Sequence, residues 1–265
     1  MTAAIREAEV VSDGHRLAAR IAAPEVRPTS GARPGLVLCH GFPARDPRAA
    51  PDRTYEHLAL RIADALGWTV LALSFRGCGE SEGSFSLAGW VRDLRAAVAH
   101  MIEEEAVDGV WVAGSATGAS IALVAAGDDP TVNGVVTMAA RADFAEWASH
   151  PRRLLEEARG LGLLAANEPR DVDAWSREFR TVEPLEGARR LGNRALFVLH
   201  GEADRRVPVD HARRIVEAHG AASFRVIAAA SHRLRLDPRA VAMVLGWLDE
   251  QALTLGGSRA PITPR

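Results

Sequence analysis

The most constraining feature of this chain is an alternation of short apolar runs with amphipathic helical stretches. Continuous apolar runs at residues 35–42 and 68–75 are typical of strands that are buried on both faces. Residues 87–101 instead place their apolar side chains at helical spacing. Strands that alternate with helices form a parallel sheet with helices on both sides. We therefore predict an α/β fold with a mostly parallel central sheet.

This alternation stops in the middle of the chain and then resumes. Residues 141–192 are charged and helical in character, and they contain no convincing strand. The pattern returns with the apolar run at residues 194–201. An interruption of about 50 residues is typical of an insertion over one edge of a sheet. We predict a core formed by residues 1–140 and 193–265, and a helical cap formed by residues 141–192.

Composition excludes several classes of function. The 265 residues carry 32 basic and 34 acidic side chains, and this balance argues against a nucleic-acid-binding protein. Every basic residue is Arg, which excludes Schiff-base chemistry and a phosphate loop that depends on Lys. No apolar stretch reaches the roughly 18 residues of a membrane span, and residues 1–10 have no apolar signal region. We expect a cytoplasmic protein without membrane or nucleic-acid partners, and the sequence predicts no oligomeric state.

Polar and glycine-rich loops follow several of the predicted strands. In chain order they read HGF, FRGCGES, GSATG and HGEAD, and a later loop, ASHRLRLDP, precedes the last helix. In this order the pattern resembles the α/β-hydrolase superfamily, of the serine hydrolase or esterase type with a helical cap. The resemblance implies that Asp204 is the catalytic acid and His232 the base. It also implies that the backbone N–H groups of Phe42 and Thr117 hold an oxyanion.

The nucleophile position departs from this resemblance. The family motif is G-x-S-x-G, and here Gly114 and Gly118 enclose Ser115, Ala116 and Thr117. With the two glycines in frame, Ala116 occupies the nucleophile position. Shifting the frame to Ser115 would put Thr117 at a crowded position of the turn, where a β-branched side chain conflicts with the tight backbone.

An alanine cannot attack a carbonyl, and three explanations remain open. The first is a serine hydrolase whose serine has been replaced, which leaves the chain inactive or able to trap its substrate. The second is a natural pseudo-hydrolase that binds a small hydrophobic ligand. In the third, Asp204 and His232 activate a water molecule directly. Retention of both residues favours the first explanation, in which the parent chemistry cleaves an ester, thioester or amide.

Large apolar side chains in the predicted cap indicate the kind of substrate. We expect at least two of Phe144, Trp147, Trp175 and Phe179 to line a cavity beside Ala116, which favours a hydrophobic acyl substrate. His and Cys residues show no metal-ligand spacing, and no cofactor or metal is expected. In other loops, His40 and His200 are interpreted as bracing residues, and Arg76 with Glu80 as an exposed pair.

Overall fold

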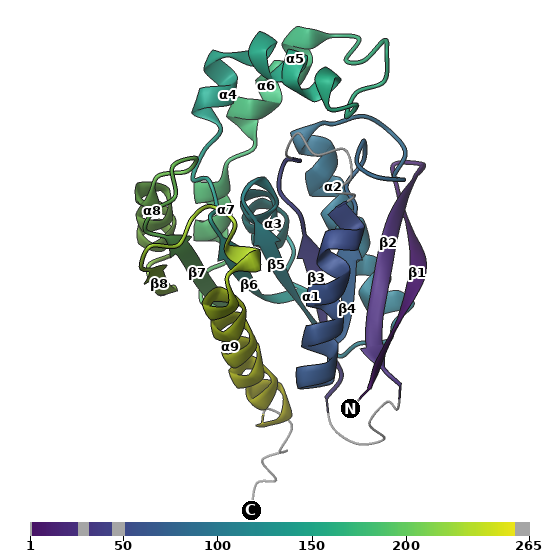
Figure 1. The fold of residues 1–265 in the computed structure, drawn as a ribbon, viewed down its shortest axis with the longest axis vertical. Coiled ribbons are helices and arrows are strands. Elements are labelled where there is room, and N and C mark those ends of the chain that lie inside the picture. The colour runs from purple at the N-terminus through teal and green to yellow at the C-terminus, as the bar shows by residue number, and fades with distance from the viewer. Residues whose placement is uncertain (1, 26–31, 44–50, 258–265) are drawn as a thin grey trace, which may run out of the picture.

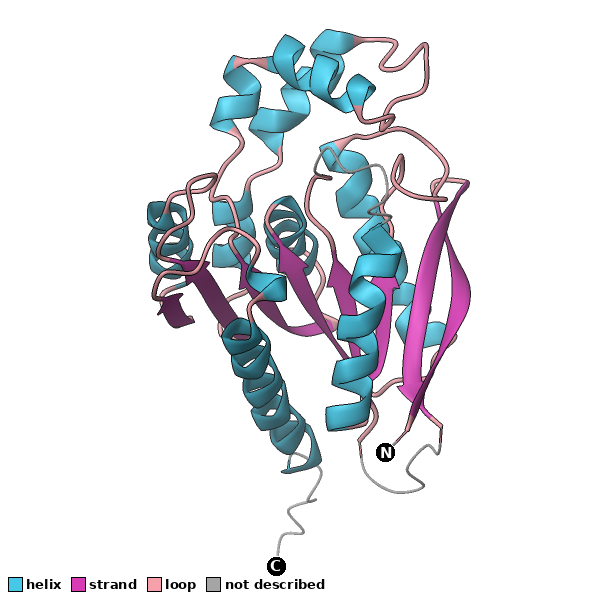
Figure 2. Cartoon of the chain, viewed as in Figure 1, coloured by secondary structure: helices cyan, strands magenta, loops and turns pink. Residues whose placement is uncertain are grey.

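The computed structural model describes residues 2–25, 32–43 and 51–257. In this part of the chain an eight-stranded sheet runs through the molecule, with helices on both faces (Figures 1 and 2). The strands are β1 (Ala3–Ser12), β2 (His15–Pro24), β3 (Pro34–Cys39), β4 (Thr69–Leu73), β5 (Gly109–Ser115), β6 (Val132–Met138), β7 (Ala195–Gly201) and β8 (Ser223–Ile227). Their order is β1-β2-β4-β3-β5-β6-β7-β8. Strands β3 to β8 are parallel, and β2 pairs antiparallel with β1 and β4. The predicted α/β fold is confirmed.

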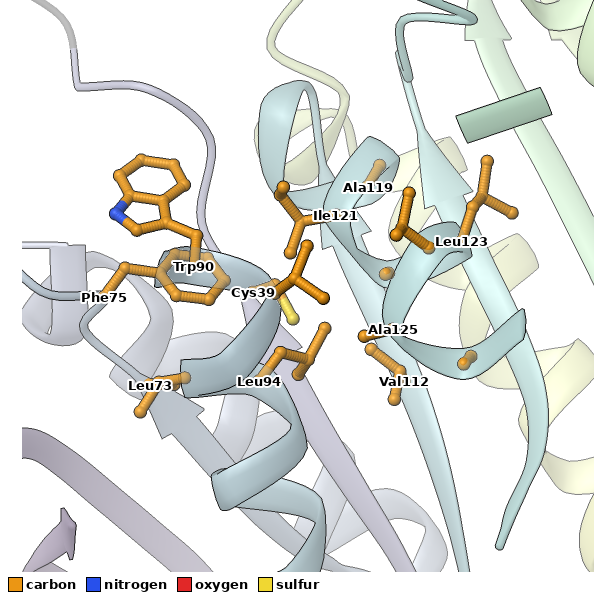
Figure 3. Packing of buried hydrophobic residues seen from close by; sticks show 14 of the residues in the cluster. Cys39, Leu73, Phe75, Trp90, Leu94, Val112, Ala119, Ile121, Leu123 and Ala125 are labelled. Carbon is orange, nitrogen blue, oxygen red and sulfur yellow. The ribbon is translucent and has the colours of Figure 1, made fainter. Parts of the chain in front are cut away.

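Two helical layers cover the sheet. One face carries α1 (Pro51–Leu66) and α9 (Pro238–Gly257), and the short 3₁₀ turn at Leu234–Leu236 precedes α9. The other face carries α2 (Leu87–Glu103), α3 (Thr117–Gly127), α7 (Pro184–Arg190) and α8 (Val209–His219). Figure 3 shows how apolar side chains of α2 and α3 pack over Cys39, Leu73 and Val112 of the strands. The sheet therefore has a core on each face, which explains why its central strands β3 to β7 are buried at nearly every position, whereas the edge strands β1 and β8 are partly exposed.

The segment between β6 and β7 divides into two structural parts. Helices α4 (Ala145–Ser149), α5 (Pro151–Gly160) and α6 (Val172–Thr181) lie above the carboxyl ends of the parallel strands (Figure 1). Helix α7 instead crosses α3 so closely that a Cβ on Gly187 would lie 2.5 Å from the Leu123 carbonyl oxygen. The division into core and cap at residues 141–192 stays a prediction, but α7 packs with the helices of the sheet.

Arg76 corrects one expectation from the sequence. Its side chain is buried, and it donates to both carboxylate oxygens of Asp93 on α2, with Nη2–Oδ1 at 2.6 Å. It also donates to Asp13 in the β1–β2 turn at 3.0 Å. Glu80 is exposed and has no part in this network. The exposed Arg76–Glu80 pair was wrong because the fold, and not the local sequence, brings Asp93 beneath the loop.

Candidate active site

One cavity opens where the carboxyl ends of the parallel strands meet the cap. Its volume is about 1250 Å³, and its lining includes Phe42, Ala116, Thr117 and His232. These residues come from the loops after β3, β5 and β8, which lie far apart in the sequence. The cavity therefore lies at the sheet edge where parallel α/β proteins place their ligands.

The chain turns sharply at Ala116, between β5 and α3. Its φ of 49° and ψ of −120° place an alanine in a left-handed conformation that costs roughly 1–3 kcal/mol. A Cβ on Gly118 would lie 2.1 Å from the His40 carbonyl oxygen, and one on Gly114 would lie 2.5 Å from the Cα of Ala119. Neighbouring backbone thus lies so close at both positions that only glycine fits there. The apex of the turn is residue 116, as the spacing of the two glycines predicts.

Ser115 lies outside this cavity. Side chains alternate along a strand, so Ser115 shares its face of β5 with Trp111 and Ala113. Those two residues belong to the core under α1 and α9, as does Met138, which pairs with Ser115 across the sheet. The Ser115 hydroxyl is buried and is not part of the cavity lining. The geometry therefore provides no place for Ser115 beside His232.

Asp204 and His232 lie in hydrogen-bond contact. The His232 Nδ1–H donates to Asp204 Oδ2 at 2.8 Å, and the Asp204 side chain is completely buried. The second oxygen, Oδ1, accepts from the backbone N–H groups of Arg206 and Val207 at 2.8 and 3.0 Å. Burial raises the pKa of Asp204, but these three hydrogen bonds outweigh it and hold the pKa below its usual value. The carboxylate thus stays charged and fixes the His232 ring.

His200 supports the Asp204 loop from beneath. Its ring is fully buried, with Nε2 at 2.9 Å from the Val207 carbonyl oxygen and 3.5 Å from Asp204 Oδ2. Burial lowers the pKa of His200, which keeps the ring neutral. Because a neutral ring has one N–H, Nε2 must carry it in order to donate to Val207. His200 therefore ties the end of β7 to the far side of the loop that holds Asp204.

The loop after β3 lies against the turn at Ala116. A Cβ on Gly41 would lie 3.0 Å from both the Cβ of Ala116 and the carbonyl oxygen of Ser115, and 3.6 Å from the Thr117 nitrogen. His40 braces this loop: Nε2 accepts from the Phe75 N–H at 3.0 Å, so Nδ1 carries the proton and donates to the Gly41 carbonyl at 2.8 Å.

Thr117 is the first residue of α3, and Phe42 belongs to the loop that His40 braces. The first N–H groups of a helix have no acceptor within the helix. A helix N-terminus also favours negative charge. Both residues line the cavity next to Ala116, so their amide groups can be offered to an anion there.

The four cap aromatics do not share one role. Trp147 lines the main cavity, whereas Phe144 and Phe179 line a second cavity of about 460 Å³. Trp175 is buried, and its indole N–H donates to the Phe85 carbonyl at 3.1 Å. The expectation that at least two of the four line the cavity beside Ala116 is therefore corrected to one. The other three are held by packing within the cap and against the α2 segment.

Charged side chains make up much of the cavity wall. They are Arg141, Glu146, Arg153, Glu156, Glu157, Arg205 and Arg206, and the polar His150 lies among them. Arg141 pairs with Glu146 at 3.0 Å and lies over the Trp147 ring at 5.6 Å. The sequence contained one usable signal for this wall, because Arg205 and Arg206 directly follow Asp204. The charges on α4 and α5 instead look like an ordinary solvated helix face until the cap is placed.

Comparison with known families then assigns the chain. The sequence profile of the family described as serine aminopeptidase, S33, matches residues 32–183. The chain belongs to this family of α/β-hydrolases. A comparison with curated proteins finds no match.

Solved structures with the same fold include esterases and a peptidase. The esterase Est1E from Butyrivibrio proteoclasticus is 16% identical with a TM-score of 0.66, over 94% of this chain and 98% of Est1E. The Pyrococcus furiosus esterase Pf2001 is 17% identical with a TM-score of 0.66, over 96% and 91% of the two chains. A Mycobacterium tuberculosis puromycin-hydrolyzing peptidase is 19% identical with a TM-score of 0.67, over 96% of this chain and 39% of the peptidase. At these identities the similarity shows the shared fold alone.

Two absences hold for the residues that the structure describes. Within them, no helix has the length and apolar character that crossing a membrane requires. The same residues contain no group of three or more His, Cys, Asp or Glu side chains placed to hold a metal ion. Both cysteines are free and buried, and burial raises the pKa of each thiol.

Proposed function

We propose that this α/β-hydrolase binds an ester, thioester or amide of a hydrophobic acyl group, and that Ala116 prevents it from turning that substrate over. The observation that carries the proposal is the Asp204–His232 hydrogen bond of 2.8 Å in a cavity whose sharp turn holds Ala116. An acid–base pair and a strained turn are each costly to maintain. Together they fit a hydrolase site that lacks only its nucleophilic oxygen.

The parent chemistry follows from these positions. With Ser at position 116, Oγ attacks the substrate carbonyl carbon while His232 Nε2 takes the hydroxyl proton. The amides of Phe42 and Thr117 stabilise the oxyanion that forms. His232 then gives its proton to the leaving group, and a water molecule releases the acyl group by the same route in reverse. Asp204 keeps the ring oriented and stabilises its charged form.

A binding protein is the second candidate, and the alanine itself favours it. In that case the cavity holds a small hydrophobic ligand, and the Asp204–His232 pair serves only to shape its wall. A direct attack by water activated through His232 is the third possibility, because this pair is complete without Oγ.

The variant Ala116→Ser tests these alternatives. We expect the variant to hydrolyse p-nitrophenyl esters and to be labelled by a fluorophosphonate, whereas the chain with Ala116 does neither. In a comparable serine hydrolase the nucleophile is worth about 10⁶-fold in rate. The matched control is Ala116→Ser combined with His232→Ala. This double variant keeps the Ser hydroxyl but should lose the ester hydrolysis that Ala116→Ser gains.

Each other result selects a different alternative. If Ala116→Ser folds but neither labels nor hydrolyses any ester, the binding protein gains support. If the unaltered chain already hydrolyses esters and His232→Ala abolishes this, water attack replaces the nucleophilic mechanism.

A further inference from the structure

Two cavities lie on opposite sides of the short helix α4. Glu146 and Trp147 of this helix and His150 directly after it line the main cavity beside Ala116, which we call the catalytic cavity. The other face of the helix, with Ala145, Ala148 and Ser149, lines the second cavity of about 460 Å³. Helix α4 is thus the partition between them.

The second cavity has an apolar floor and a charged mouth. Its most buried lining residues are Ala142, Phe144, Phe179 and Val182. Its charged lining residues are Asp143, Arg180, Glu183, Glu186 and Arg189, and none of them is buried. The volume falls in the range of about 300–1,000 Å³ that is usual for ligand pockets. A floor of this kind favours an alkyl or aryl group over a polar one.

The indole of Trp147 lies between the two cavities. It forms part of the catalytic wall, and its ring contacts Phe42 on the cavity side at a centroid distance of 5.4 Å. It also contacts Phe144 at 5.2 Å and Phe179 at 6.0 Å, and these two rings form the wall of the second cavity. The rings of Trp147, Phe144 and Phe179 are therefore side chains of the wall between the two cavities.

The partition is also a weak element. Helix α4 has five residues, and its N-cap residue, Phe144, makes no side-chain capping bond, although Asp143 Oδ1 accepts from the Ala145 N–H at 3.1 Å. So short a helix has little stability of its own. Besides packing against α6, the helix is held by the aromatic contacts of Trp147, by the Arg141–Glu146 pair and by Arg141 over the indole. Because the indole contacts both of the rings that line the second cavity, a change in its position would alter the wall between the two cavities.

We infer that the second cavity receives the distal end of the substrate acyl chain and that Trp147 is the gate that sets how long a chain is accepted. This inference rests on the proposed function, because it assumes an acyl substrate in the catalytic cavity. The inference assigns the charged wall of the catalytic cavity and the apolar floor of the second cavity to different parts of the substrate. The charged wall faces the leaving-group side, and the apolar floor behind α4 holds the chain.

The first experiment measures binding to the chain with Ala116, so it does not depend on catalysis. Dodecanoate and butanoate are titrated calorimetrically into the unaltered chain and into two variants, Trp147→Ala and Ala148→Phe. Each buried methylene is worth about fourfold in affinity. We expect Trp147→Ala to strengthen dodecanoate binding by about tenfold or more relative to butanoate. Ala148→Phe fills the second cavity from its own side and should weaken dodecanoate alone.

The double variant Trp147→Ala with Ala148→Phe completes the test. If the gain comes from the second cavity, filling that cavity must remove it. A gain that survives Ala148→Phe would overturn the inference, because the extra room would then lie within the catalytic cavity. An unchanged ratio of dodecanoate to butanoate affinity in both Trp147→Ala and Ala148→Phe would overturn the inference as well. The inference would also be overturned if Ala148→Phe blocked dodecanoate binding while Trp147→Ala left it unchanged. In that case the ligand would enter the second cavity from solvent and not past Trp147.

The gate and the proposed function can fail separately. If Ala116→Ser shows no hydrolysis but the expected chain-length effects on binding are observed, the proposed hydrolysis is wrong and the role of the second cavity is supported. If Ala116→Ser is active but adding Trp147→Ala leaves its chain-length preference among p-nitrophenyl esters unchanged, the role of Trp147 and the second cavity is wrong while the proposed function stands. Trp147→Leu, which keeps an apolar side chain on α4, serves in place of Trp147→Ala if that variant unfolds.

Discussion

The sheet body and the cap of this protein hold their functional side chains in different ways. In the body, Ala116 is held in a turn whose flanking glycines lie too close to neighbouring backbone to carry a Cβ. Asp204 is held by three hydrogen bonds to its carboxylate. In the cap, Trp147 is fixed by side-chain packing on a five-residue helix. The comparison shows that the proposed reacting groups lie on a rigid backbone framework, whereas the cap side chain that lines the same cavity depends on packing. The two regions should therefore respond differently to substitution.

The largest expected difference concerns activity in the Ala116→Ser background. Asp204→Asn should reduce ester hydrolysis by about 10⁴-fold, because the ring of His232 would lose the partner that selects its tautomer. Trp175→Phe in the cap should reduce the rate by less than about tenfold, since Trp175 lies outside the cavity lining. Steady-state kinetics on one p-nitrophenyl ester measures both. Similar losses in the two variants would contradict the separation of roles.

The next difference concerns stability and uses two glycines. Gly118→Ala should lower the free energy of unfolding by about 3 kcal/mol or more, because its Cβ would meet a backbone oxygen at 2.1 Å. At Gly160, in the cap, a Cβ meets nothing within 4 Å, so Gly160→Ala should change stability by about 0.5 kcal/mol or less. Urea unfolding of both variants tests this. A tolerated Gly118→Ala would mean that the turn at Ala116 can relax.

A third prediction concerns the pH dependence of the body. Burial lowers the pKa of His200 in the folded state, whereas the unfolded chain takes up a proton below about 6.5. The stability contributed by a neutral His200 is thus present above this pH and is lost as the pH falls toward the folded-state pKa. His200→Gln should therefore flatten the decline in unfolding free energy between about pH 6.5 and 5. An unchanged slope, measured by denaturant titration at several pH values, would assign the decline to other groups.

The smallest expected effect tests how the cap is attached to the body. The indole N–H of Trp175 donates to the buried Phe85 carbonyl, and Trp175→Phe removes this bond while keeping an aromatic ring. We expect a loss of about 0.5–1.5 kcal/mol in unfolding free energy. A loss several times larger would show that the cap is held to the body by this contact more than by its apolar packing.

Local sequence patterns predicted most of the body. The apolar runs identified the parallel strands because a strand buried on both faces must be apolar throughout. The resemblance to the G-x-S-x-G motif predicted the turn at Ala116, and the structure gives the reason for the second glycine, because a Cβ on Gly118 would lie 2.1 Å from the His40 carbonyl oxygen. The resemblance to the α/β-hydrolases singled out Asp204 and His232 by their order in the chain, and the structure places His232 Nδ1 at 2.8 Å from Asp204 Oδ2. Their chemical role stays a prediction until Ala116→Ser is tested.

The sequence by itself determined the sheet, the turn and the residue types at the strand ends, because these depend on neighbours in the chain and on the period of each element. Tertiary structure alone decided that Arg76 is buried on Asp93, that only Trp147 of the four cap aromatics lines the cavity beside Ala116, and that α4 contributes to two cavities. The physical reason is the same in each case. An apolar or charged side chain is compatible with several partners, and the choice among them is made by which distant segment the fold brings within contact distance.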